Sequence, residues 1–174
     1  MSLNEEYDRL CAIPSDINEH LPALRALAAQ CDHVTEMGVR GGCSTIALAC
    51  GYPGRMISYD VNPIPAAVKA MIEQEVDFTF IQADVREIEI MPTDLLFIDT
   101  LHTYTQLSAE LKRHARDALK FIVFHDTVTF GTHGEDGKTP SLRQAIIDNL
   151  DQTHWKMRDD YRNNNGLMVM ERKA

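Results

Sequence analysis

Residues 93–104, TDLLFIDTLHTY, contain an apolar run of strand length that ends abruptly at Asp99. His102 follows three residues later. An uninterrupted apolar run bounded by polar residues is typical of a strand that is buried on both faces of a sheet. Such strands occur in α/β proteins, whose ligands bind at the carboxyl ends of the strands. The sequence therefore predicts that Asp99 and His102 lie at a ligand-binding edge.

Residues 120–131, KFIVFHDTVTFG, repeat this construction, because a second apolar run leads into His125 and Asp126. If the two strands are parallel neighbours, their axes lie about 4.8 Å apart. Two carboxylates held that close repel each other unless a proton or a cation lies between them. Asp99 and Asp126 thus indicate a divalent cation, and oxygen ligands suit Mg²⁺, Mn²⁺ or Ca²⁺ better than zinc. The alternative is that Asp126 caps the next turn and His125 packs against the sheet.

Strand-like and helix-like segments alternate along the rest of the chain, which predicts a doubly wound α/β fold with a mostly parallel sheet. Residues 155–159 and 166–172 are expected to be closing strands, with an antiparallel strand near the C-terminus. The remaining strands are expected at 33–38, 56–60 and 78–84, and helices at 21–31, 44–50, 65–75, 103–120 and 141–150.

The composition predicts a single domain over residues 1–174, with residues 1–20 as an N-terminal extension able to act as a lid. A net charge of −9 argues against nucleic acid or an anionic membrane as the main partner. No apolar run is long enough to span a bilayer, and the N-terminus lacks the pattern of a signal peptide. None of the 4 cysteines forms a C-x-x-C pair, so we expect reduced thiols in a cytoplasmic protein.

The segment EMGVRGGCST, residues 36–45, joins the first predicted strand to a helix expected to begin at Ser44. Its glycines, Gly38, Gly41 and Gly42, allow a sharp turn and a close approach of a ligand to the backbone. The spacing is E-x-G-x-x-x-G rather than the G-x-G-x-x-G of dinucleotide-binding folds. An ordinary strand-to-helix turn is the alternative.

Two further acids follow predicted strands. Asp60 lies about 20 residues beyond the glycines, where a carboxylate can accept both hydroxyls of a ribose, although it is also placed to cap the next helix. Asp84 is placed where it could receive an adenine amino group, although it is also consistent with a loop residue or a cap. Taken together, the three strand ends indicate a cofactor that contains adenosine.

In this order, the motifs resemble those of the class I S-adenosylmethionine (SAM)-dependent methyltransferases. More narrowly, the chain is similar to the small-molecule O-methyltransferase group that includes macrolide sugar methyltransferases and cephalosporin-hydroxylase-like proteins. The resemblance implies a Rossmann-like methyltransferase fold. The matching segments span about residues 33–171 and read EMGVRGGCST, SYDVNP, IQADV, LLFIDTLHTY, FIVFHDT and NNNGLMVMER.

The resemblance also implies which residues contact the cofactor. Asp60 would hold the ribose and Asp84 would lie near the adenine. The residues that would line the methionine end of SAM are Glu36, Gly38, Gly42 and Ser44, and Asp99 is also counted among the cofactor-binding residues.

A metal site and a base are implied in the same way. Asp99 and Asp126 would bind a divalent cation, expected to be Mg²⁺, and His102 would be the general base. Some relatives have an acidic residue where this chain has His125, which we take as the third ligand.

These observations predict an O-methyltransferase that uses SAM and acts on a small molecule such as a sugar. No inserted substrate domain is apparent, so the acceptor is either small or enclosed by a second subunit of a homo-oligomer. One alternative is a methyltransferase fold that binds SAM without catalysis. Others are a nicotinamide-dependent oxidoreductase, since Asp60 also suits an NAD ribose, and an iron-dependent oxygenase that uses His102 or His125 with the carboxylates.

Overall fold

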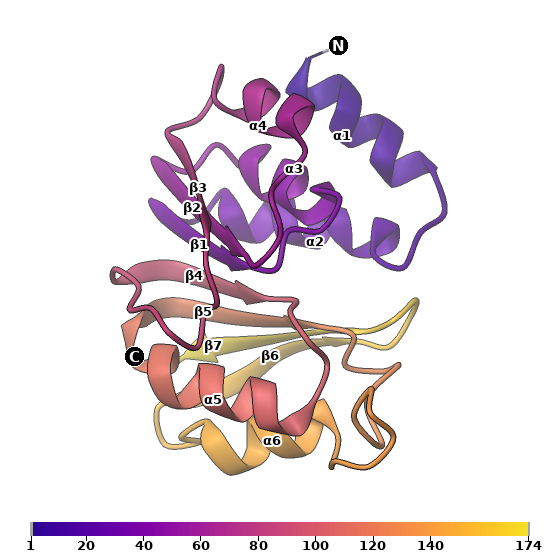
Figure 1. The fold of residues 1–174 in the computed structure, drawn as a ribbon, viewed down its shortest axis with the longest axis vertical. Coiled ribbons are helices and arrows are strands. Elements are labelled where there is room, and N and C mark those ends of the chain that lie inside the picture. The colour runs from indigo at the N-terminus through magenta and orange to yellow at the C-terminus, as the bar shows by residue number, and fades with distance from the viewer. Residues whose placement is uncertain (1, 174) are drawn as a thin grey trace.

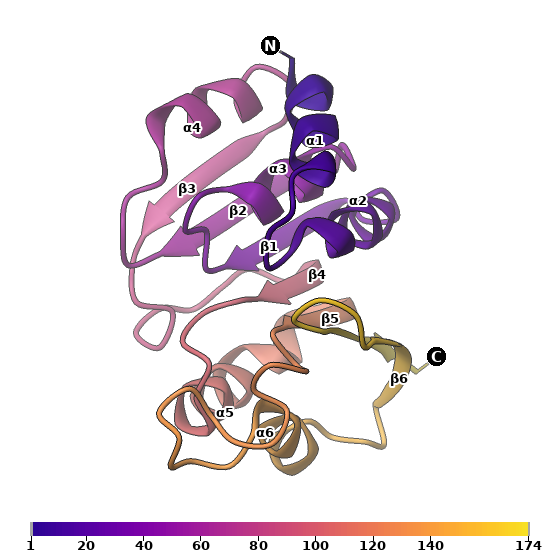
Figure 2. The ribbon, with the colours of Figure 1, turned by 90° about the vertical axis from the view of Figure 1, so that its right-hand side faces the viewer.

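The computed structural model describes residues 2–173, which form a seven-stranded sheet with helices on both faces (Figures 1 and 2). No helix in this range is long and apolar enough to cross a membrane. The strands are β1 (His33–Met37), β2 (Arg55–Asp60), β3 (Phe78–Gln82), β4 (Thr93–Ile98), β5 (Ala118–His125), β6 (Trp155–Tyr161) and β7 (Leu167–Arg172). The helices are α1 (Leu3–Ala12), α2 (Leu21–Ala28), α3 (Cys43–Ala49), α4 (Ala66–Ile72), α5 (Tyr104–His114) and α6 (Leu142–Asn149).

The strand order is β3-β2-β1-β4-β5-β7-β6. Strands β1 to β5 pair in parallel, whereas β7 runs antiparallel to both β5 and β6. This topology confirms the predicted doubly wound, mostly parallel sheet with an antiparallel strand near the C-terminus. From β1 the chain adds β2 and β3 on one side and then returns to add β4 and β5 on the other, so the strand order reverses between the parallel neighbours β1 and β4. In such sheets a ligand is expected at the carboxyl ends of the strands at this switch point.

The uninterrupted apolar run of β4 follows from burial on both of its faces. Leu95 and Phe97 belong to the core that includes side chains of α1 to α4, whereas Leu96 and Ile98 belong to the core beneath α5 and α6. None of the four is more than 4% exposed. An alternating strand would have left one of these two helical layers without an apolar surface to cover.

The N-terminal extension contains a helix that the sequence analysis did not assign, because residues 3–12 form α1. Its start is a capping box, in which the Ser2 hydroxyl accepts from the Glu5 amide and the Glu5 carboxylate accepts from the Ser2 amide. Leu3 is fully buried in the core. The helix is therefore part of the layer that covers the sheet.

The helix predicted at 103–120 is wrong at its C-terminal end. Helix α5 stops at His114, a 3₁₀ turn covers Ala115–Asp117, and β5 already begins at Ala118. Ala118 pairs with Thr93 of β4, so the sheet captures residues that the four-residue spacing had assigned to the helix. Leu119 accordingly points outward and is 49% exposed.

A buried carboxyl group connects three elements beneath the site. Glu36 of β1 has no solvent exposure. Its two oxygens accept hydrogen bonds from Ser44 of α3 and Ser58 of β2, each at 2.6 Å. Burial raises the pKa of Glu36 to about 7, although the serine hydroxyl groups act in the opposite direction.

We predict that this group makes stability depend on pH. The native pKa is higher than the unfolded one, so native Glu36 keeps its proton while the unfolded chain loses it, and stability falls as pH rises from 4.5 to about 7. Between about pH 5.5 and about pH 7.5 the free energy of unfolding should fall by about 2 kcal/mol more in the wild type than in Glu36→Gln. Urea denaturation of both proteins measures this, and parallel pH profiles would contradict it.

Candidate functional site

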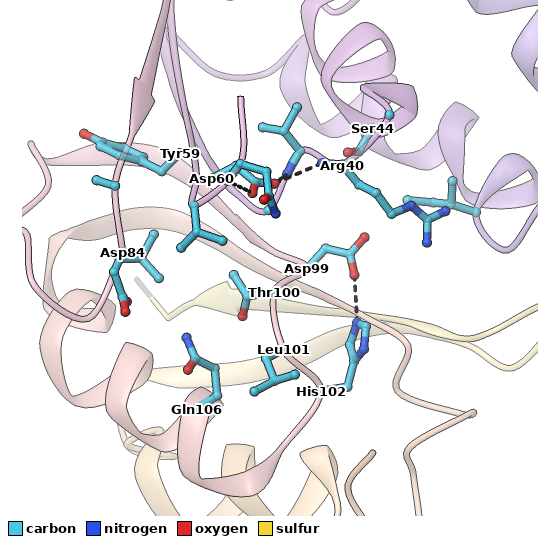
Figure 3. Close-up of a pocket in the computed structure, with 18 of the residues that line it drawn as sticks. Arg40, Ser44, Tyr59, Asp60, Asp84, Asp99, Thr100, Leu101, His102 and Gln106 are labelled. Atoms are coloured by element: carbon cyan, nitrogen blue, oxygen red, sulfur yellow. Dashed lines mark hydrogen bonds and ion pairs between the residues drawn. The ribbon is translucent and has the colours of Figure 1, made fainter. Parts of the chain in front are cut away.

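A cavity of about 650 Å³ opens at the carboxyl ends of the parallel strands (Figure 3). Its size suits a small organic ligand or cofactor. The segments that follow β1, β2, β3 and β4 all contribute to its walls. In the view of Figure 3, Asp84 lies on the left, His102 at the lower right, and Asp60 above them both. The predicted site residues that line it are Gly38, Ser44, Asp60, Asp84, Asp99 and His102.

Two of the predicted cofactor-binding residues, Glu36 and Gly42, do not line the cavity. Glu36 lies beneath the cavity, bound to the two serines, and does not line it. Gly42 precedes α3 with φ 87°, and a Cβ there would lie 2.7 Å from the Val68 side chain. Both residues therefore shape the turn around the cavity, and the structure gives neither of them a surface toward a ligand.

Gly38 brings the ends of β1 and β4 together. It has φ 91°, and a Cβ atom at this position would lie 2.0 Å from the carbonyl oxygen of Asp99. Only a residue without a side chain allows this approach and this backbone conformation. The turn after β1 and the first acid of the site are thus placed by direct backbone contact.

Asp60 stabilises the same turn. One of its oxygens accepts from the backbone amides of Val39 and Arg40, at 2.8 and 3.0 Å, and the other accepts from the Asn62 amide at 2.8 Å. Burial raises the pKa of Asp60, but these backbone hydrogen bonds outweigh it and leave the pKa below its usual value. An ionised carboxylate at the cavity wall retains lone pairs for ligand hydroxyl groups.

Asp84 lines the cavity, but its carboxylate is already paired. The Arg86 guanidinium lies 2.6 Å from it and holds the pKa of Asp84 below its usual value. A ligand amino group would therefore share this carboxylate with Arg86.

Two acids and two histidines meet where Asp99 and His102 line the cavity; the other two, His125 and Asp126, are buried behind them and do not line it. The Nδ1 atom of His125 lies 3.4 Å from Asp99 Oδ1 and 3.2 Å from Asp126 Oδ2. The Nε2 atom of His102 lies 3.2 and 2.9 Å from the same two oxygens. Ligand atoms of Asp99, His125 and Asp126 all fall within 4.8 Å of one another, a spacing compatible with a metal ion, and His102 is outside this set.

Electrostatics couples these four groups. Burial lowers the pKa of His102, but the carboxylates of Asp126 and Asp99 outweigh it and raise that pKa to about 10. The same balance of burial against the two acids raises the pKa of His125 to about 9. Burial raises the pKa of Asp126, but the imidazoles of His102 and His125 outweigh this effect and hold that pKa far below its usual range. The two acids therefore require positive charge, which protons on the histidines or a cation can provide.

Three residues that the sequence analysis did not assign support this cluster. The Asn165 amide donates to Asp126 at 2.7 Å. Glu135 lies 3.2 Å from the Nδ1 of His102, and its backbone amide donates to the His102 carbonyl oxygen at 2.8 Å. The Phe130 ring stacks on the imidazole of His102 at 4.8 Å. No local motif marks these residues, because they come from the loops after β5 and before β7.

The segment between α1 and α2 also reaches the cavity. Asp16 and Ile17 contribute to its lining. The Asp16 carboxylate lies 2.8 Å from the guanidinium of Arg40, which follows β1. Asp16 and Ile17 are thus the residues of the N-terminal extension that lie at the cavity. That the extension acts as a lid remains a prediction.

No protein-family model and no curated protein matches the chain. Solved structures do match. The cofactor-bound protein Rv0187 from MTB superimposes with a TM-score of 0.69 at 21% identity, over 97% of this chain and 87% of that one. The N-methyltransferase NodS from Bradyrhizobium japonicum WM9, in complex with S-adenosyl-l-homocysteine, gives 0.67 at 13% identity over 100% of both chains. The O-methyltransferase from Bacillus cereus in complex with SAH gives 0.65 at 17% identity, over 98% of this chain and 90% of that one.

The chain therefore has the Rossmann-like fold of the class I methyltransferases, as its motifs indicated. At these identities the likeness shows the fold, and the activity has to be argued from the site.

We predict that Gly38→Ala disrupts the site through the backbone of Asp99. A left-handed backbone conformation costs an alanine about 1–2 kcal/mol, and the clash with the Asp99 carbonyl adds to this. The free energy of unfolding should fall by at least about 2 kcal/mol. Gly41→Ala is the matched control, since nothing lies within 4 Å of its Cβ position. Urea denaturation measures both, and equal stability of the two variants would contradict the role assigned to Gly38.

Proposed function

We propose that the protein is a SAM-dependent O-methyltransferase that transfers a methyl group to a hydroxyl of a small molecule, with a sugar or another polyol as the expected acceptor. The observation that carries this proposal is the arrangement of one cavity with two different ends. Asp60 and Asp84 line one part of it, and Asp99 and His102, the partly exposed members of an acid–histidine cluster, line another. The first part suits an adenosine group, and the second suits the activation of a hydroxyl.

The cofactor residues have separate tasks in this proposal. The Asp60 carboxylate would accept the ribose hydroxyls, while it keeps the turn after β1 in place through the Val39 and Arg40 amides. Asp84 would accept from the adenine amino group. Gly38 and Ser44 would border the methionine end. When bound, SAM supplies a methyl group that is already activated by its positively charged sulfur.

His102 is the proposed general base. Transfer to an alcohol forms an oxygen–carbon bond as the carbon–sulfur bond breaks, and the hydroxyl proton must go to a base. His102 lines the cavity, its Nε2 faces the two acids, and Glu135 and Phe130 fix its ring. Burial lowers the pKa of His102, but the two acids raise it to about 10 and so keep His102 protonated when no other positive charge is near. With a cation held between the acids, His102 would no longer have to neutralise them, and Nε2 would be free to take the proton.

The cation proposed at this site would be held by Asp99, His125 and Asp126. These residues fit a cation because their ligand atoms converge, and because both ring nitrogens of His125 are buried without a hydrogen-bond partner. When bound, a divalent ion lowers the pKa of a coordinated hydroxyl. His102 is not one of the three proposed ligands, but its Nε2 lies 3.2 and 2.9 Å from the same two carboxylate oxygens, so the proposed base would lie beside the ion.

The experiment that tests the proposal is methyl transfer from radiolabelled SAM to a panel of sugars and diols, with and without EDTA. We predict transfer to at least one acceptor and a loss of activity in EDTA. His102→Asn should lower the rate by about 10²–10⁴-fold and leave SAM affinity in calorimetry unchanged.

His154→Asn is the control, since His154 is exposed and pairs only locally with Asp151 and Thr153. Equal rates for His102→Asn and the wild type would remove the base from the mechanism. SAM binding without transfer to any acceptor would favour the non-catalytic binding module.

A further inference from the structure

His125 is the member of the cluster that departs from some relatives, which have an acidic residue at this position. It occupies the last position of β5, is 2% exposed, and has no hydrogen bond to either ring nitrogen. Buried polar atoms in native proteins are almost always paired, so an imidazole with both nitrogens unpaired needs an explanation. A coordination bond to an ion between the acids would explain it for Nδ1.

The geometry around Nδ1 supports this explanation. The atom lies 3.4 Å from Asp99 Oδ1 and 3.2 Å from Asp126 Oδ2, within ion-pair distance of both, but without the geometry of a hydrogen bond to either oxygen. Three ligand atoms this close together could share a metal ion as a common partner. Two of these atoms are carboxylate oxygens and the third is an imidazole nitrogen.

The backbone and neighbouring side chains keep this donor set in place. Asp126 has φ 57°, a left-handed conformation that is uncommon for aspartate, and Asn165 donates to its other oxygen at 2.7 Å. The ring of His20, which is fully buried, lies edge-on to that of His125 with the centroids 5.4 Å apart. The imidazole of His125 is therefore close to a second ring as well as to the two acids.

The donor set discriminates between ions. Mg²⁺ takes oxygen ligands and retains several waters, whereas imidazole nitrogen is a ligand of first-row transition ions. We infer that this site takes a first-row transition ion, with Mn²⁺ as the representative that suits both carboxylates and imidazole, in preference to the Mg²⁺ that the sequence analysis expected. This inference rests on the cation site of the proposed methyltransferase and names the class of ion that it holds.

The test uses the EDTA-treated full-length protein, without SAM or acceptor, and titrates it with Mn²⁺ and with Mg²⁺ by calorimetry. We expect Mn²⁺ to bind at least about 10-fold more tightly than Mg²⁺. His125→Asn should weaken Mn²⁺ binding by about 10-fold or more and change Mg²⁺ binding little. The preference for Mn²⁺ over Mg²⁺ should therefore be largely lost in this variant. His154→Asn removes an exposed histidine and should leave both affinities unchanged.

Pulsed electron paramagnetic resonance of the Mn²⁺-loaded wild type provides a measurement that needs no variant. Coupling of the ion to a directly bound ¹⁴N nucleus is expected in the wild type. Absence of this coupling, or Mg²⁺ binding as tightly as Mn²⁺, would overturn the inference.

These outcomes are separate from the fate of the proposed function. An all-oxygen site that binds Mg²⁺ would refute the role of His125 and leave a cation-dependent methyltransferase intact. Mn²⁺ bound through nitrogen in a protein that never binds SAM would refute the methyltransferase and keep the metal site.

Discussion

The site depends on the repulsion between two carboxylates that the sheet holds side by side. The adjacent strands β4 and β5 place Ile98 opposite Phe124, so the next residues, Asp99 and His125, also lie next to each other. Asp126 is one residue further along and turns back through its left-handed backbone. Positive charge is then required between the acids, and the two histidines that face them can provide it as protons or share the space with a cation.

The turn after β1, which borders the cavity, is held next to these acids by contacts from β1, β2 and α3. Gly38 lets β1 end against the backbone of Asp99, so the turn that borders the cavity and the first acid cannot move independently. Asp60 holds the amides of that turn, and Glu36 joins the turn's helix to β2 from beneath. In the proposed function, a cofactor bound along this turn has its reactive end next to Asp99 and His102.

The sequence predicted the parts of this arrangement that follow from local patterns. Apolar runs predicted the parallel strands, and the polar residues at their ends predicted which side chains share one edge. Helix α1 was missed, although Ser2 and Glu5 have the spacing of a capping box. The position of Glu36 could not be read from the glycine motif, because hydrogen bonds to residues on two other elements decide it. Glu135 and Asn165 were not predicted because they reach the site from loops distant in sequence, and only tertiary structure shows what such loops contact.

In the proposed function, the acids at the ends of β4 and β5 hold a cation beside a SAM-binding cavity. A crystal structure of the protein grown with S-adenosylhomocysteine and Mn²⁺, with anomalous data that locate the metal, tests both parts at once. We predict one strong anomalous peak bonded to Asp99, His125 and Asp126, with the ribose of the ligand at Asp60 and its sulfur near Asp99. A ligand elsewhere on the protein, or no metal between these three side chains, would contradict it.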